Sequence, residues 1–147
     1  MTDWRVVWKN QQNRLKALLQ TTHPYCSGRI YLNFWRTDET FPCIYAFIMD
    51  DTPEVIQHGA QPQRYTSHTN WRMVYRVQAT DTPENDHLSL MSGIGGLANL
   101  PMDYAVQSGC WYRSQLSSVD FTYESPSIAP GVILEGAVDI ILRSEAL

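Results

Sequence analysis

Carboxylates and histidines gather in one polar stretch of the chain, and these side chains are the ones best suited to metal or acid–base chemistry. They are Asp50, Asp51, Glu54, His58 and His68. Oxygen and imidazole ligands bind divalent metals when the chain brings several of them together. Their spacing here matches no recognised metal motif. The stretch therefore favours a solvated loop, with a small metal-dependent hydrolase using these carboxylates and histidines as the enzymatic alternative.

Two further patterns could support catalysis, and each has a simpler explanation. Gly93-Ile94-Gly95-Gly96 resembles a phosphate-binding loop, but it follows a predicted helix, whereas such loops follow a strand and open a helix. We expect these glycines to end that helix. Ser114, Ser117 and Ser118 lie close together without the Gly-x-Ser-x-Gly elbow of serine hydrolases. The sequence thus predicts no catalytic residue and no cofactor.

The cysteines do not indicate a zinc site or a disulfide framework. Cys26, Cys43 and Cys110 are odd in number, far apart and without a Cys-x-x-Cys pair. Reduced thiols in a cytoplasmic protein are the expected state. The chain start lacks the pattern of a signal peptide, and no apolar run has the length of a membrane span. We expect a soluble protein without a membrane partner.

Aromatic and basic residues could in principle form a surface that binds nucleic acid, but the sequence favours another role for them. Five tryptophans could stack on bases, and most of them fall at positions that the periodicity assigns to the core: Trp4, Trp8, Trp35, Trp71 and Trp111. The net charge of −4 also argues against binding through phosphates. Arg72 and Arg76 share one face of a predicted strand, where arginines are more often solvated or paired across a subunit contact.

Two predicted strands and the segment between them organise the fold. Phe41 to Met49 is a short apolar run that predicts a strand covered on both faces. Thr69 to Ala79 alternates in the manner of a strand with one buried face. The polar segment at 50–68 predicts an extended arm, with a short helical turn at 51–54. Connections of this length are usually functional or disordered, so we expect a partner to order the arm.

The remaining pattern predicts two helices and further strands. The first helix covers residues 3–20, with Thr2 or Asp3 as its cap. The second begins near Pro83 and reaches about Ser92 or beyond, with Leu88, Met91 and Ile94 facing inward. Strands are expected at 29–36, 111–124 and 132–143. The fold class is α+β: a mostly antiparallel β-sheet with two helices packed on one face, in a single domain of residues 1–147.

The composition is that of a globular domain whose surface is poor in charge. Hydrophobic residues make up 44% of the 147 residues, and charged residues make up 18%. These proportions exclude wholesale disorder. A surface with few charges and several aromatic residues is typical of subunit contacts. The composition thus favours a protein that works by contact with other proteins.

The order of these elements resembles the tail terminator family of long-tailed bacteriophages. The matching features are an N-terminal amphipathic helix, the Phe41-Pro42 entry into an apolar strand, and the long arm that leads to the alternating strand at 70–77. A helix from about Pro83 and a terminal strand pair ending in Val132 to Arg143 complete the resemblance. Tail-completion and head–tail joining (neck) proteins are similar in outline.

This resemblance implies a structural virion protein and not an enzyme. Such a subunit forms a hexameric ring that caps the tail tube, ends tail polymerisation and offers a docking surface to the head connector. Its partners would be its own copies, the tail tube protein and the head–tail connector. DNA would pass through the lumen without specific binding, since an acidic lumen repels phosphates. The expected location is the head-proximal end of the virion tail, and the host cytoplasm during assembly.

The arm and the strand after it supply the expected interface. These residues are Asp50, Asp51, Glu54, His58, Gln61, Gln63, Arg64, Tyr65, His68, Arg72 and Arg76. We expect the arm to contact a neighbouring subunit or the tube and to gain order on binding. The sequence leaves open a neck protein, the hydrolase named above, and a module that binds a peptide by strand addition.

Overall fold

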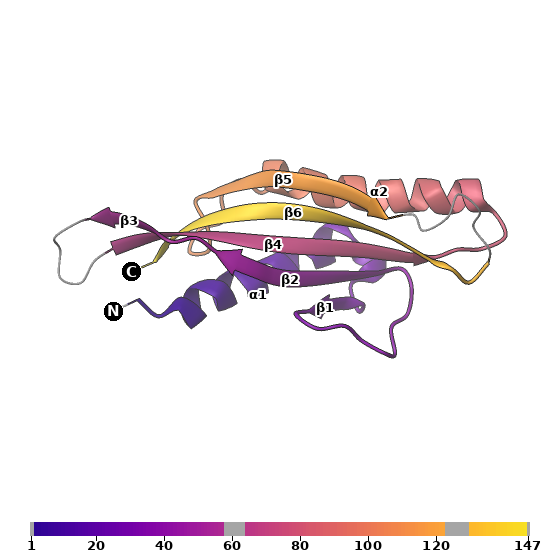
Figure 1. Cartoon of the computed structure of the whole chain (residues 1–147), viewed down its shortest axis with the longest axis horizontal. Coiled ribbons are helices and arrows are strands. Elements are labelled where there is room, and N and C mark those ends of the chain that lie inside the picture. Colours follow the sequence, from indigo (N-terminus) through magenta and orange to yellow (C-terminus); the bar gives the residue numbers. More distant parts are fainter. Residues whose placement is uncertain (1, 58–63, 123–129, 147) are drawn as a thin grey trace.

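Two helices cover one face of a six-stranded sheet, in a computed structural model that describes residues 2–57, 64–122 and 130–146 (Figure 1). The two α-helices are α1 (Trp4–Thr22) and α2 (Pro83–Asp103), and a short 3-10 helix, η1 (Pro24–Cys26), follows α1. The strands are β1 (Ile30–Leu32), β2 (Cys43–Asp51), β3 (Glu54–Gln57), β4 (Arg64–Gln78), β5 (Arg113–Thr122) and β6 (Ile133–Ala146). Within the described residues, no helix is long and apolar enough to cross a membrane.

The sheet is mixed and mostly antiparallel, which confirms the predicted α+β class. Its strands lie in the order β1-β2-β4-β6-β5, and β3 adds to β4 beyond the end of β2. Only β1 runs parallel to its neighbour among the described strand pairs. The helices place their apolar stripes on one face, where Leu15 and Leu19 of α1 join Leu90 and Leu97 of α2 in the main core.

The two alternating strands at the centre of the sheet follow the predicted pattern. Trp71, Met73 and Tyr75 of β4 are buried against the helices. Their partners on β6 are Ile140, Val138 and Gly136 in the same order. Because side chains alternate between the two faces, this register puts one polar and one apolar side on both strands. The cap of the first helix is also confirmed, since the Asp3 side chain accepts a hydrogen bond from the Val6 backbone amide.

The predicted arm is wrong as a loop, because most of the described part of 50–68 is strand. Asp50 and Asp51 end β2, Thr52 and Pro53 connect it to β3, and β3 begins at Glu54, so the helical turn expected at 51–54 is wrong. Thr66 of β4 lies between Glu54 of β3 and Glu145 of β6. Backbone pairing on both sides of β4 therefore orders a segment whose polar side chains suggested a loop. The described residues of the segment, 50–57 and 64–68, form the end of the antiparallel pairing of β2 and β3 with β4, and we call them the hairpin end.

The glycine run does not end the second helix, contrary to the prediction. α2 continues through it to Asp103. A Cβ atom on Gly93 would lie 2.4 Å from the Tyr75 ring, and one on Gly96 would lie 2.9 Å from the His23 ring. The missing side chains let α2 approach the sheet and the end of α1 closely. Leu88 and Met91 are exposed instead of buried, while Ile94 is buried as expected.

The predicted strand at 29–36 is shorter in the structure, and a loop follows it. β1 ends at Leu32, and Asn33 takes a positive φ of 64°. Burial of β2 on both faces holds only for Cys43 to Ala46. There a second, smaller apolar cluster forms on the face that carries no helix, and it contains Cys43, Tyr45 and Val74. The loop at 33–42 packs over this cluster.

Candidate functional site

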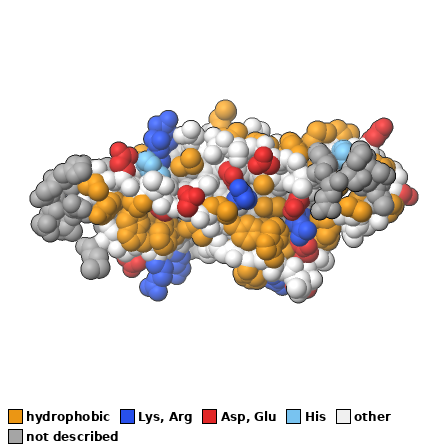
Figure 2. Space-filling model, in the orientation of Figure 1, with side chains coloured by type: hydrophobic (Ala, Val, Ile, Leu, Met, Phe, Trp, Pro, Cys, Tyr) orange, Lys and Arg blue, Asp and Glu red, His pale blue; other side chains and the backbone are white. Residues whose placement is uncertain are grey.

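The sheet face without helices carries an aromatic surface, which we define as Tyr31, Phe34, Trp35, Tyr45 and Phe47. Phe34 and Trp35 are exposed, Tyr31 and Phe47 are partly buried, and Tyr45 is fully buried. The Trp35 ring lies 4.5 Å from the Tyr45 ring and 4.9 Å from the Phe47 ring, measured between centroids. Phe34 is 59% exposed and Trp35 is 55% exposed. Figure 2 shows hydrophobic side chains gathered over β1, β2 and the loop between them. Large apolar groups in water on one face mark a contact surface.

The loop that carries Phe34 and Trp35 is fixed to the sheet by a buried carboxylate. Glu39 accepts a hydrogen bond from the Tyr45 hydroxyl at 2.5 Å and pairs with Arg76 at 2.5 Å. The Arg76 guanidinium also lies 5.2 Å from the centroid of the Trp35 ring, a cation–π contact. Because Glu39 and Arg76 are both largely shielded from water, their pairing orders the aromatic surface before any partner arrives.

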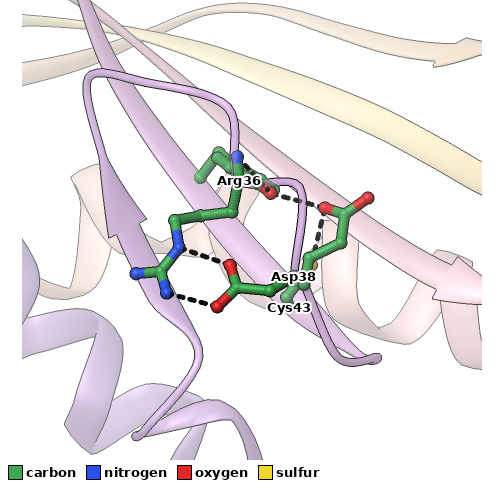
Figure 3. Close-up of polar contacts among 5 residues, drawn as sticks. Arg36, Asp38 and Cys43 are labelled. Carbon is green, nitrogen blue, oxygen red and sulfur yellow. Dashed lines mark hydrogen bonds and ion pairs between the residues drawn. The ribbon is translucent and has the colours of Figure 1, made fainter.

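Figure 3 shows the polar contacts of the same loop, in which Arg36 and Asp38 form a second, exposed ion pair. The two hydrogen bonds between them are each 2.9 Å long. Cys43 lies beside the loop, and burial together with the Glu39 carboxylate raises the pKa of its thiol to about 12. The thiol is therefore protonated at neutral pH and is a poor nucleophile. These contacts give the loop a structural role.

Arg72 and Arg76, both expected at an interface, lie on this face but are already paired within the chain. Arg72 donates to both oxygens of Asp139, at 2.9 Å and 3.1 Å. Ser118 donates to the same carboxylate at 3.1 Å. The hydrogen bonds from Arg72 lower the pKa of Asp139 against the opposing effect of burial. Each of the two guanidinium groups therefore already has a carboxylate partner within the chain.

The expected interface residues of the hairpin lie at the far end of the sheet. Asp51 Oδ2 accepts hydrogen bonds from Trp8 Nε1 at 2.8 Å and from Thr69 Oγ1 at 2.9 Å, and Ser67 Oγ also donates to it. The Tyr65 ring lies 5.7 Å from the Trp4 ring. The hairpin end is thus joined to the start of α1.

The other expected residues of the hairpin do not form a single cluster. Glu54 lies 3.7 Å from His68. Asp50, opposite Asn70, and Arg64, opposite Gln57, are exposed. His58, Gln61 and Gln63 lie outside the described residues. Among the residues that are described, no three His, Cys, Asp or Glu side chains lie together in a way that could hold a metal ion.

Sequence reasoning missed the aromatic surface. The alternation at 29–36 predicts a strand or extended edge with Phe34 and Trp35 on opposite faces, and most of the five tryptophans fall at positions that the periodicity assigns to the core. The one available signal was Phe34-Trp35 followed directly by the charged and polar residues of 36–40. Two adjacent large aromatic residues cannot both be buried by a strand with one covered face. That conflict could have indicated a loop with exposed rings.

Comparison of the sequence with protein-family models gave no match, and neither did comparison with curated proteins. Two surfaces of the molecule are therefore the candidates for function, the aromatic surface and the hairpin end. Both combine aromatic rings with charged groups. Tryptophan, tyrosine and arginine are the residues that most often dominate the energy of protein–protein contacts.

Proposed function

We propose that this protein is an assembly subunit that forms a ring at the end of a bacteriophage tail tube. In this role it ends tail polymerisation and provides the docking surface for the head connector. The observation that carries the proposal is the aromatic surface, where Phe34 and Trp35 are more than half exposed. Both stand in the loop that packs, through Trp35, over the sheet face without helices. Rings held in place by Glu39 and Arg76 lose little freedom on binding, which favours affinity.

The positions of the two surfaces support head-to-tail contact between copies. The loop that carries Phe34 and Trp35 connects β1 to β2, while β3 lies near one end of the long axis of the molecule (Figure 1). Different surfaces on one subunit make heterologous contacts, and these close into a ring when the rotation per subunit fits. The resemblance in element order supplies the particular assembly: copies of this chain, a tail tube and a connector, with DNA passing through without specific binding. The proposed place is the head-proximal end of the virion tail.

The test is to mix the purified protein with its tail tube protein and to measure assembly by negative-stain electron microscopy and native mass spectrometry. We expect a closed ring at one end of each tube. Phe34→Ser should weaken assembly by at least about tenfold, because it removes a large exposed ring next to Trp35 in the chain. Leu88→Ser on α2 is the matched control, since Leu88 is also 59% exposed but lies on the other side of the sheet.

Three outcomes would contradict the proposal. One is a wild-type protein that leaves tube length unchanged. Another is equal loss of assembly in the Phe34→Ser and Leu88→Ser variants, which would show that the aromatic surface has no special part. The third is a ring that binds to head particles and never to tubes, which would assign the chain to the neck.

A further inference from the structure

The hairpin end contains a hollow whose walls are aromatic rings and one carboxylate. Its lining residues are Trp4, Trp8, Asp51, Pro53 and Tyr65, and its volume is about 480 Å³. The Trp4 ring lies 6.0 Å from the Trp8 ring at an angle of 28°, and 5.7 Å from the Tyr65 ring. Figure 2 shows hydrophobic side chains gathered over the start of α1 and the end of β2. Three elements far apart in the sequence therefore build this hollow.

Asp51 brings a negative charge into the hollow that the described part of the chain does not offset. The three hydrogen bonds to its Oδ2 atom come from the neutral groups of Trp8, Ser67 and Thr69. Its Oδ1 atom is shielded from solvent and has no hydrogen-bond partner. No Lys, Arg or His of the described ranges pairs with this carboxylate. Buried polar atoms without partners are rare, because they lose water and gain nothing in return.

The rings select the kind of group that could complete the site. The face of an indole or phenol ring is electron-rich and attracts cations, with tryptophan the strongest of the three aromatic residues. A carboxylate beside such rings adds charge attraction. A neutral apolar ligand would use the rings but would leave the charge of Asp51 without a counter-charge. The combination therefore fits an organic cation.

We propose that this hollow binds the ammonium or guanidinium group of a lysine or arginine side chain supplied by a partner protein. The rings of Trp4, Trp8 and Tyr65 receive the cation, and Asp51 neutralises it. The evidence for the cation site is the arrangement of the three rings and the Asp51 carboxylate around the hollow. The identity of the partner rests on the proposed function, under which it is a neighbouring subunit or the tube protein.

The first test is titration of the full-length protein with capped amino acids, followed by NMR of the Trp4 and Trp8 indole N–H groups. The probes are the Nα-acetyl amides of lysine and arginine, with that of norleucine as an uncharged probe of similar length. We expect the cationic probes to shift both signals to saturation, and norleucine to bind at least about tenfold more weakly. Equal binding of all three probes, or no shift with any of them, would overturn the proposal.

Two matched substitutions show whether the carboxylate takes part. Asp51→Asn keeps the shape of the side chain and an oxygen for its hydrogen-bond donors, but removes the charge. It should weaken the binding of the lysine probe by at least about tenfold. Asp50→Asn is the control, because Asp50 is the exposed neighbour opposite Asn70 and lies outside the hollow. Unchanged binding of the lysine probe by Asp51→Asn would contradict a role for the carboxylate. The NMR spectra of the backbone amides show whether both variants are folded.

A third measurement identifies the source of the cation. If a partner side chain fills the hollow, Asp51→Asn should weaken assembly on tail tubes by at least about tenfold. Asp81→Asn should leave assembly unchanged, because Asp81 is exposed and follows the other end of β4, away from the hollow. Loss of probe binding with normal assembly would contradict a protein source and indicate a small free cation. If the wild-type protein forms no assembly at all, the proposed function fails, yet the NMR titration still decides whether the cation site exists.

Discussion

Gly93 and Gly95 lie two residues apart in α2. At the scale of single residues, we expect the same change, glycine to alanine, to have opposite effects on the free energy of unfolding at these two positions. A Cβ atom at Gly93 would lie 2.4 Å from the Tyr75 ring, whereas one at Gly95 would meet nothing within 4 Å. We expect Gly93→Ala to lower the free energy of unfolding by about 1–3 kcal/mol, because the buried Tyr75 must move. Gly95→Ala should raise it by about 0.5–1 kcal/mol through better helix propensity.

Urea denaturation of the two variants beside the wild-type protein measures both effects. The pair serves as its own control, since the two changes are chemically identical and share one helix. Equal shifts in the same direction would mean that helix propensity alone decides, and that the close approach of α2 to β4 is unimportant. Opposite shifts would support the packing reason for the glycine run.

At the scale of elements, His23 connects the end of α1 to α2. Its Nε2 lies 3.1 Å from the Gly93 carbonyl oxygen, and its Nδ1 lies 2.8 Å from the Thr22 hydroxyl. Burial lowers the pKa of His23, and the hydrogen bond to Gly93 opposes this only in part. The folded protein therefore holds a neutral imidazole at a pH where the unfolded chain has begun to bind a proton.

The lowered pKa of His23 predicts that the free energy of unfolding falls as the pH drops. The unfolded chain takes up the proton as the pH passes below about 6.5, while the folded chain takes it up only at lower pH. We expect the urea midpoint to decrease between about pH 7.5 and about pH 5. His23→Gln keeps a hydrogen-bonding side chain without the titration, so its midpoint should depend less on pH. Identical pH profiles would place the effect in other groups.

At the scale of the whole molecule, we propose that the sheet with its two α-helices, which form the body, provides stability and that the hairpin end serves assembly. The described residues of the two apolar clusters include none from the range 54–65. We therefore expect a variant without residues 54–65 to keep its far-UV circular dichroism and cooperative unfolding. The same variant should lose assembly on tail tubes by at least about tenfold, because it lacks β3 and the Tyr65 wall of the hollow.

Electron microscopy of tubes mixed with this variant measures the second effect. An unfolded variant would mean that the hairpin end belongs to the body, since its pairing with β6 would then be needed for stability. A folded variant that assembles normally would remove the hairpin end from the proposed contact. The aromatic surface would then have to carry assembly without it.

Much of the central sheet could be predicted because alternation is local information. Trp71, Met73 and Tyr75 repeat every second residue, and only one face of a strand can then be apolar. The same reasoning placed Val138 and Ile140 correctly on β6. The expected interface at the hairpin could be located only as a polar segment. Its pairing with the end of β6 depends on residues about 80 positions away, as the Tyr65–Ala146 pair shows.

The sequence by itself determined the α+β class, the buried faces of the central strands and the start of both helices, since periodicity and capping act over a few residues. Only the tertiary structure decided that α2 runs through its glycines, that the hairpin end is strand, and that Trp35 is exposed. Each of these depends on a neighbour distant in the chain: Tyr75 beneath Gly93, β6 beside β4, and Arg76 over Trp35. Long-range packing outweighs local preference wherever the two disagree.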